Sequence, residues 1–334
     1  MARFEDVGPR IPVVESIRVD KVSPRARLLG MVRAIVVIVF AFVALIPVFV
    51  MGATAFKTRA DIVSSPPKIF FTPTLEGFVY LLTERAVASQ ARLEELQKNA
   101  ETGNLGLIES IALSVGQEVT GPSDYTVRLR NSIIIAGFST ITSVALGLFA
   151  AYAFSRFHIP GKSDLLFFIL STRMLPAVVV TIPLFLMYRQ LGLHDTHFGM
   201  ILLYTVFNLS FSVWLLKGFI DEIPREYEEA ALVDGYTRWQ AFRKIVLPQT
   251  VTGIAATAVF CLIFAWNEYA FALMMTSEDA QTAPPAIATM LGRGGIEWSA
   301  IAAGTLGFLI PVVIVTFALR RYLLRGVTFG AIRQ

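Results

Sequence analysis

The residues of this sequence that could take part in chemistry mostly interrupt long apolar runs. Arg173 lies in one run, Asn208 in the next, and the segment Asn267-Glu268-Tyr269 directly follows Trp266 in a third. Amide, carboxylate and aromatic groups bind polyhydroxylated molecules through hydrogen bonds and through stacking on C–H faces. The same groups also tie helices together, so the residue types leave both roles open.

Arg173 is a cation within an apolar run. An ionisable side chain inside a membrane is costly and usually faces a cavity or a partner. Arg173 is therefore expected either to contact a substrate path or to pair with a carboxylate or a carbonyl dipole. The residues that we predict to line such a path are Arg173, Asn208, Trp266, Asn267, Glu268 and Tyr269.

Several kinds of catalytic site are excluded by the residues present. The glycine-containing segment 292–295 lacks the lysine of a phosphate-binding loop. The three histidines, His158, His194 and His197, are expected in short loops on opposite sides of a membrane, which does not give metal-ligand spacing. Cys261 is the one cysteine, so an intrachain disulfide is impossible. We predict no catalytic residue, metal or cofactor in this chain, and no ATP hydrolysis by it.

The composition is that of a membrane protein. Of 334 residues, 55% are hydrophobic and only 16% are charged. Such a balance is far from that of a soluble domain. The net charge of +4 is weak grounds for binding nucleic acid, and we predict none. The chain should be mostly helix buried in lipid.

Six apolar runs are long enough to cross about 30 Å of hydrocarbon as helices. The first is too long for a signal peptide and has no small-residue cleavage site after a short core, so it is taken as a span. We therefore predict an all-α membrane protein with six transmembrane helices. The runs are 34–52, 132–154, 165–188, 198–220, 250–275 and 300–324.

Lys and Arg set the predicted orientation. With the N-terminus inside, the cytoplasmic segments carry more of these cations than the outer segments, and most of the outer ones lie in one long segment where the rule is weak. Both termini are therefore expected in the cytoplasm. The predicted parts are a basic tail (1–33), a first helix (34–52), an extracytoplasmic segment (53–131) with an insertion (about 83–125), a core domain (132–324) and a C-terminal tail (325–334).

The insertion at 83–125 combines a charged helical pattern with a later glycine-containing stretch. It is expected to be a small extracytoplasmic unit, such as a helical hairpin near a docking face. A tolerated loop without direct function fits the same pattern equally well.

A polar island at 222–248 separates the fourth and fifth predicted spans. Two short helices are expected there, because Gly235 can take the left-handed conformation that ends a helix. Thr237 and Gln240 then form a capping box that opens the second helix. Helical spacing places Trp239, Phe242 and Val246 on one face.

The island resembles the EAA loop of permease subunits in binding-protein-dependent ABC importers. The resemblance implies that it is a cytoplasmic coupling helix seated in a groove of a separate ATPase subunit. An amphipathic helix resting on the lipid surface is the alternative reading. The residues implied in coupling are Glu229, Ala230, Ala231, Asp234, Gly235, Trp239, Phe242, Ile245 and Pro248.

Two further segments resemble carbohydrate permeases of the maltose type. The run from Trp266 to Tyr269 is similar to their fifth-span motif, W-N-E-[FY]. The segment 277–299 corresponds to an outer loop that contacts the docked binding protein. On this chain the contact would fall on Thr289, Gly292, Arg293, Gly294 and Gly295.

The resemblance implies an assembly in the bacterial inner membrane. Its members are a second and different permease, an ATPase dimer holding ATP and Mg, an extracytoplasmic solute-binding protein and membrane lipid. The expected cargo is a sugar or sugar derivative, with a polyol, a glycoside or an anionic sugar derivative as alternatives. A secondary transporter fits poorly, because we find neither a coupling-ion site nor a repeat of spans. A membrane scaffold is the remaining alternative.

Overall fold

The structure is a computed structural model that describes residues 24–292 and 295–329. Most of the predicted basic tail and the last residues of the C-terminal tail lie outside the described part. The chain divides into two units, Met1–Val50 and Met51–Gln334, which are described separately.

The first unit consists of most of helix α1, Pro24–Ala55. Proline suits the start of a helix, because the N–H that it lacks would have no partner in the first turn. From Leu28 to Val50 the side chains are almost all apolar and exposed. A long apolar stretch with exposed side chains, such as residues 28–50, fits a lipid environment.

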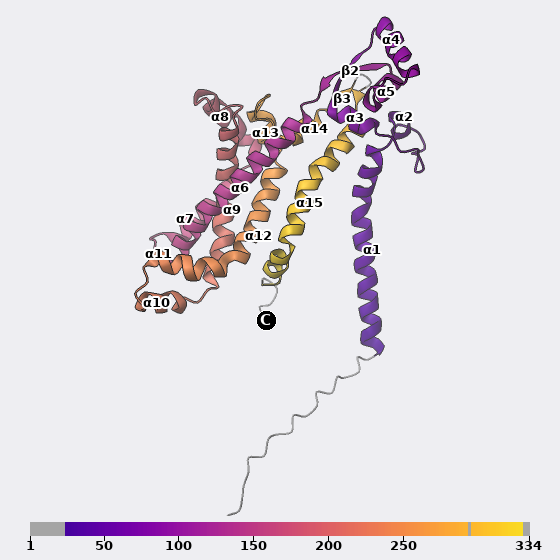
Figure 1. Ribbon diagram of the computed structural model, residues 1–334. Coiled ribbons are helices and arrows are strands. Elements are labelled where there is room, and N and C mark those ends of the chain that lie inside the picture. The colour runs from indigo at the N-terminus through magenta and orange to yellow at the C-terminus, as the bar shows by residue number, and fades with distance from the viewer. Residues whose placement is uncertain (1–23, 293–294, 330–334) are drawn as a thin grey trace, which may run out of the picture. The chain divides into compact units, whose positions relative to one another are not determined.

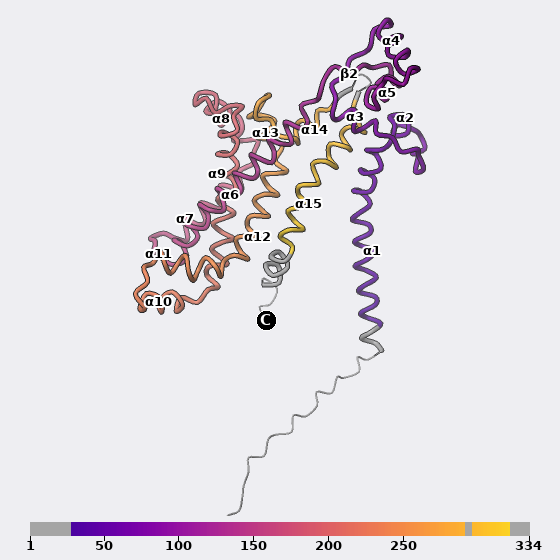
Figure 2. The backbone as a smooth tube through the Cα atoms, viewed as in Figure 1, coloured from indigo at the N-terminus to yellow at the C-terminus, as the bar shows by residue number. Residues whose placement is uncertain are grey.

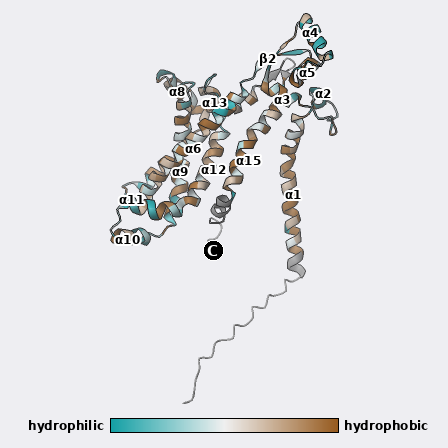
Figure 3. Ribbon diagram, viewed as in Figure 1, coloured by the Kyte–Doolittle hydropathy of each residue, from teal (hydrophilic) through white to brown (hydrophobic). Residues whose placement is uncertain are grey.

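The centre of the second unit is a bundle of four long helices (Figure 1). Helix α12 packs against all three of its companions, and α6 packs most extensively along α9. Most residues of these helices are apolar (Figure 3). The four helices are α6 (Tyr125–Arg156), α9 (His197–Asp221), α12 (Leu247–Trp266) and α15 (Trp298–Phe329).

Small residues allow α6 and α9 to approach closely. A Cβ at Gly147 would lie 2.5 Å from the Cβ of Ser212. Ser139 and Ser143, on the same helix, are fully buried. Helices in membranes pack where small side chains let their backbones meet, so this contact fixes the two helices against each other.

The predicted third span is broken. It consists of α7 (Lys162–Ser171), a short turn η1 (Thr172–Met174) and α8 (Ala177–Gln190), with a bend of 91° between the two halves. Pro176 explains the break, because it has no N–H and pushes the preceding residue into an extended conformation. Leu175 has that conformation, with ψ of 124°. Among the described residues there are five candidate spans, and six when this bent pair is counted.

The predicted fifth span, 250–275, ends earlier than expected: the candidate span in the structure is Arg238–Trp266. Helix α12 ends at Trp266, and a separate helix α13 (Ala270–Met275) follows. The carboxylate of Glu268 accepts the backbone N–H groups of Phe271 and Ala272, at 2.9 and 3.0 Å. Side-chain acceptors of this kind stabilise the start of a new helix, so Glu268 marks the boundary.

The insertion contains the two expected helices, α4 (Gln90–Glu101) and α5 (Leu107–Ser114). It is closed by a strand pair that the sequence did not predict: β1 (Thr83–Val87) runs antiparallel to β2 (Gln117–Pro122). Helices α2 (Arg59–Ile62) and α3 (Glu76–Leu82) precede it. The strand pair brings both ends of the insertion together, so the insertion leaves and rejoins the chain at one place.

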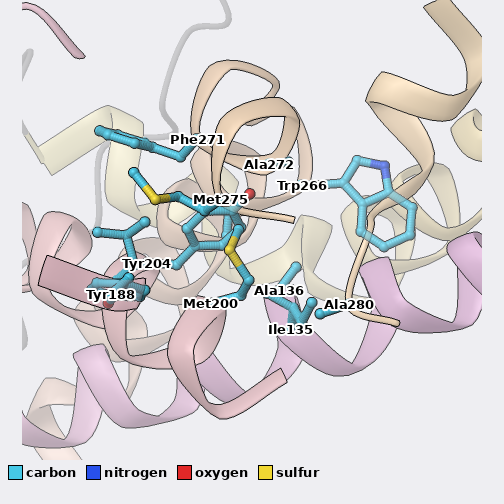
Figure 4. Packing of buried hydrophobic residues seen from close by; sticks show 12 residues of the cluster. Ile135, Ala136, Tyr188, Met200, Tyr204, Trp266, Phe271, Ala272, Met275 and Ala280 are labelled. Carbon is cyan, nitrogen blue, oxygen red and sulfur yellow. The ribbon is translucent and has the colours of Figure 1, made fainter. Parts of the chain in front are cut away.

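A core cluster lies where α6, α8, α9 and α13 meet (Figure 4). Met200 and Met275 fill the space between aromatic rings, and both are almost fully buried. Unbranched thioether side chains suit such irregular gaps. The cluster thereby holds α13, the short helix that follows the end of α12 at Trp266.

The remaining elements lie in two connections of the bundle. Helix α9 is joined to α12 by helix α10 (Glu226–Val233), helix α11 (Arg238–Ala241) and the π-helical segment η2 (Phe242–Val246). The trace turns back on itself between α10 and α11 (Figure 2). Helix α14 (Ala283–Ala288) and the strand pair β3 (Leu291–Gly292) and β4 (Gly295–Ile296) precede α15.

Candidate functional site

The polar island at 222–248 folds as the expected helical hairpin. Gly235 has a φ of +87°, the left-handed conformation that glycine adopts at low cost. The N–H of Gly235 donates to the carbonyl of Leu232 at 3.1 Å, and that of Tyr236 donates to the carbonyl of Ala231 at 3.0 Å. These two bonds form a Schellman motif, which ends α10 sharply.

The second helix of the hairpin opens with the expected capping box. The N–H of Gln240 donates to the Thr237 hydroxyl at 3.2 Å, and the N–H of Thr237 donates to the Gln240 side chain at 2.8 Å. The chain then passes through η2 into α12 without a loop. The hairpin is therefore continuous with a membrane helix at its C-terminal end.

Phe242 anchors the hairpin to the bundle. It is 3% exposed, and its ring centroid lies 4.7 Å from that of Tyr152 on α6. Trp239 stacks on Phe242 at 5.4 Å but stays 59% exposed. Val246 is fully buried in the same cluster. The predicted face is thus confirmed for Phe242 and Val246, whereas Trp239 lies at its edge.

A buried ion pair forms a second anchor, which the sequence analysis missed. Glu228 on α10 pairs with Arg156 at the end of α6, and the two side chains are 10% and 6% exposed. The hydroxyl of Tyr152 also donates to Glu228, at 2.9 Å, and Arg156 donates to the carbonyl of Ile223 at 2.9 Å. In the same region, the guanidinium of Arg225 donates a hydrogen bond to the backbone carbonyl of Ser155 at 2.7 Å.

The residues left exposed on the hairpin form its outer surface. Glu229, Ala230, Asp234 and Pro248 are exposed, whereas Ala231 is buried. Of the two adjacent alanines, only Ala230 is therefore part of this outer surface. Because Phe242 and the ion pair Glu228–Arg156 hold the hairpin against the bundle, this surface is fixed relative to the bundle.

A cavity of about 330 Å³ lies between the broken span, α9 and α12. Three of the predicted path residues line it: Arg173, Asn208 and Glu268. Tyr204, also in its lining, donates its hydroxyl proton to Glu268 at 2.8 Å. Asn208 is 3% exposed and donates to the carbonyl of Cys261 at 3.1 Å, so it also ties α9 to α12.

Arg173 sits in the turn between α7 and α8. Its guanidinium carbon lies 4.3 Å from the centroid of the Phe264 ring, a distance typical of a cation–π contact. Its Nη1 is 3.5 Å from the carbonyl of Phe207. No ion pair is formed by Arg173 within the described part of the chain. Its charge is thus balanced by a ring and a carbonyl dipole next to an open cavity.

The other predicted path residues lie elsewhere. Trp266 is 4% exposed, stacks on Phe308 and donates to its carbonyl at 3.2 Å. Asn267 donates to the carbonyl of Ile263 at 2.8 Å, which continues the hydrogen bonding at the end of α12. Tyr269 is 41% exposed. None of the three is among the residues lining this cavity.

A carboxylate joins two loops at the other end of the bundle from the hairpin, and the sequence analysis missed it as well. Asp195, which has a φ of +55°, accepts the backbone N–H groups of residues 277–280 at 3.0 to 3.2 Å. Burial opposes its charge, but the four donors outweigh burial and lower the pKa of Asp195 below its ordinary value. Two residues further along the chain, the Nε2 of His197 lies within hydrogen-bond distance, 2.9 Å, of the Oδ1 of Asn131.

The loop expected to contact a binding protein is described in part. Thr289 ends α14 and donates to the carbonyl of Pro285 at 2.9 Å. Gly292 and Gly295 face each other across the strand pair β3–β4. Arg293 and Gly294 lie outside the described residues. Over the described part of the chain, no group of three or more metal-ligating side chains is assembled.

The family to which this chain belongs follows from comparison with known proteins. The model of binding-protein-dependent transport system inner membrane components matches residues 143–329, which include the hairpin and the cavity. The chain therefore belongs to this family. It is a multi-pass membrane permease component of an ABC transporter, and ATP hydrolysis belongs to a separate subunit of such systems.

Three curated relatives are similar over most of their length. A probable ABC transporter permease protein, y4oR of Sinorhizobium fredii, is 32% identical over 88% of this chain and 92% of its own. The trehalose transport permease SugB of Mycobacterium tuberculosis is 39% identical, over 63% of this chain and 77% of its own. The maltose/maltodextrin permease MalG of Salmonella typhimurium is 33% identical, over 70% and 81%.

A solved structure supports the fold. A bacterial ABC transporter involved in the import of the acidic polysaccharide alginate contains a chain that superimposes with a TM-score of 0.63. The match covers 90% of this chain and 98% of that one, at 21% identity. This likeness confirms the predicted fold class, a mostly helical membrane protein.

Proposed function

We propose that this permease conducts a sugar or sugar derivative across the bacterial inner membrane, into the cytoplasm. The observation that carries the proposal is the hairpin at 222–248, a rigid element with an exposed surface that is continuous with α12. The substrate class is supported by relatives whose names specify trehalose and maltose transport. Membership of a binding-protein-dependent family supports an extracytoplasmic binding protein as the source of the cargo.

The proposed assembly contains this chain, a second and different permease, and a dimer of ATPase subunits that hold ATP and Mg. Both termini and the hairpin lie in the cytoplasm, as the distribution of Lys and Arg indicates. The exposed residues Glu229, Ala230 and Asp234 contact the ATPase. Arg173, Asn208 and Glu268 face the cargo during passage, since they line one cavity beside the broken span.

The coupling follows from the way in which the hairpin is held. ATP-driven closure of the ATPase pair moves the exposed surface of α10. The buried pair Glu228–Arg156 carries this displacement into α6, and η2 carries it into α12. A coupling element must respond to ligands at both ends, and the hairpin has a contact surface at one end and two membrane helices at the other.

Reconstitution of the whole complex in liposomes tests the proposal. ATP hydrolysis should rise when the cognate binding protein is added together with its sugar, and trehalose and maltose are the first sugars to try. Glu229→Lys should abolish this stimulation and uptake while leaving membrane insertion intact. A complex that transports sugar without ATP would identify a secondary transporter, and one that does neither would identify a scaffold.

A further inference from the structure

A second cavity, of about 500 Å³, lies outside the bundle, between the insertion and the start of α15. Its walls come from α3, β1 and β2 on one side and from the segment around β3–β4 on the other. The lining includes Tyr80, Arg85, Gln117, Met290 and Glu297. The cavity thus lies between the insertion and the strand pair β3–β4 that precedes α15.

One wall holds a buried carboxylate. Glu297 is 6% exposed, and its Oε2 has no hydrogen-bond partner among the described residues. Its Oε1 forms an ion pair with the Nη1 of Arg59 at 3.8 Å, a distance longer than a hydrogen bond, so only Oε2 is left without a partner in the described part of the chain. Buried polar atoms are nearly always hydrogen-bonded, so a free acceptor in this position calls for a donor.

The opposite wall holds a buried donor. The guanidinium carbon of Arg85 lies 3.4 Å from the Tyr80 ring centroid, and its Nη1 donates to Gln117 at 2.6 Å. The Nε of Arg85 is buried, and no described residue accepts its proton. Arg85 and Glu297 therefore line one cavity, each with an unused polar atom, and they form no ion pair with each other.

The occupant must supply both a donor and an acceptor. A peptide group or an Asn or Gln side chain does this with its N–H and its C=O. A sugar hydroxyl does so too, but the ring face that would stack a sugar, that of Tyr80, is covered by Arg85. Exposed apolar side chains favour a protein: Val87 lines the cavity and is 39% exposed, and Ile296 and Trp298, the chain neighbours of Glu297, are 43% and 50% exposed. Exposed apolar and aromatic residues around a buried polar centre are typical of protein interfaces.

We infer that this cavity is a docking site for a loop of the extracytoplasmic binding protein, whose peptide or amide groups donate to Glu297 and accept from Arg85. This inference rests on the proposed function. It gives the insertion a role, because the insertion supplies Arg85 and supports Met290 and Ala300 through Ile111. Docking on this site would place the binding protein directly beside β3–β4.

The test uses the complete complex in liposomes and measures the concentration of binding protein that half-saturates ATP hydrolysis. Glu297→Ala and Arg85→Ala should each raise it at least tenfold, since each removes one side of the paired contact. Glu94→Ala, on the exposed face of α4, is the matched control and should leave it unchanged. ATP hydrolysis without binding protein should stay as in the wild type for all of these variants.

A second variant guards against misfolding. Val87→Glu changes an exposed lining residue and should weaken docking without lowering the unfolding temperature. Unchanged half-saturation in Glu297→Ala and Val87→Glu would overturn the inference. Binding of trehalose to the permease without binding protein, lost in Glu297→Ala, would also overturn it and identify a sugar site. A wild-type complex that does not respond to binding protein would overturn the proposed function and, with it, this inference.

Discussion

At the residue scale, adjacent glutamates on α10 have different roles. Glu228 is buried against Arg156, whereas Glu229 is exposed. A buried charge that loses its partner costs about 3–5 kcal/mol. The stability of the hairpin should therefore depend on Glu228, and the contact with the ATPase on Glu229.

The first prediction concerns this pair. Glu228→Ala should lower the free energy of unfolding by about 3–5 kcal/mol, because it leaves Arg156 buried and unpaired. Denaturation in detergent measures the change, with Glu229→Ala as the matched control of near-wild-type stability. Arg156→Ala combined with Glu228→Ala should cost less than the sum of the single changes. Additive losses would show that the two side chains do not interact.

The second prediction concerns the pH dependence of Asp195. Its pKa is lowered in the folded state, so its contribution is present above the unfolded pKa and is lost as the pH falls through the folded pKa. Acidification from pH 7 to below the ordinary carboxyl range should therefore loosen the join between segments 191–196 and 276–282. Asp195→Asn should be less stable by about 1–3 kcal/mol at pH 7.

Unfolding temperatures of wild type and Asp195→Asn, measured in detergent from pH 7 downward, check this prediction. The difference between the two proteins should shrink as the pH falls. Asp279→Asn is the matched control, because Asp279 contributes only its backbone N–H and carbonyl to the hydrogen bonds of this join. A difference that is constant with pH would assign the effect to something other than the charge of Asp195.

At the element scale, the close contact of α6 with α9 sets the third prediction. Gly147→Ala would bring a Cβ within 2.5 Å of Ser212 and should destabilise the protein by about 1–3 kcal/mol through overpacking. Gly137→Ala, on the same helix, meets nothing within 4 Å and should be neutral or slightly stabilising. Thermal unfolding in detergent separates the two. Equal effects would show that the helices do not approach as described.

The break in the predicted third span could not be predicted from hydropathy. The sequence contains Pro176, but the residues on both sides are apolar, so the run reads as one helix. The extended conformation that Pro176 imposes on Leu175 bends the chain by 91°. Glu268 ends the fifth span early for a related reason, since its carboxylate caps a new helix. Apolar length predicts that a segment crosses the membrane, and it does not predict that the segment is continuous.

Local patterns were predicted best. Gly235, Thr237 and Gln240 act within a few residues of one another, and the structure has the conformation and the bonds that their types require. The ion pair of Arg156 with Glu228 joins residues 72 positions apart, and Asp195 reaches residues more than 80 positions away. Spacing along the chain carries no sign of such pairs. Only the packing of the helices brings them together.

At the scale of the whole molecule, the chain has a contact surface at one end of its bundle and a polar cavity at the other. The hairpin at 222–248 serves the first, and the cavity between the insertion and α15 serves the second. Between them lies the smaller cavity lined by Arg173, Asn208 and Glu268. In the proposed function, the hairpin contacts the ATPase and the cavity beside the insertion contacts the binding protein, so this order would match a cargo delivered outside and driven by ATP hydrolysis inside.

The most direct measurement of the central claim is cross-linking from the hairpin in the intact complex. Cys261 is the one native cysteine and is buried, so a benzophenone maleimide can be attached to Ala230→Cys with little background. Irradiation should capture the ATPase subunit from position 230 and block ATP hydrolysis. The same probe at Glu94→Cys should capture no ATPase. Failure of capture from position 230, or capture of the ATPase from position 94, would contradict the account.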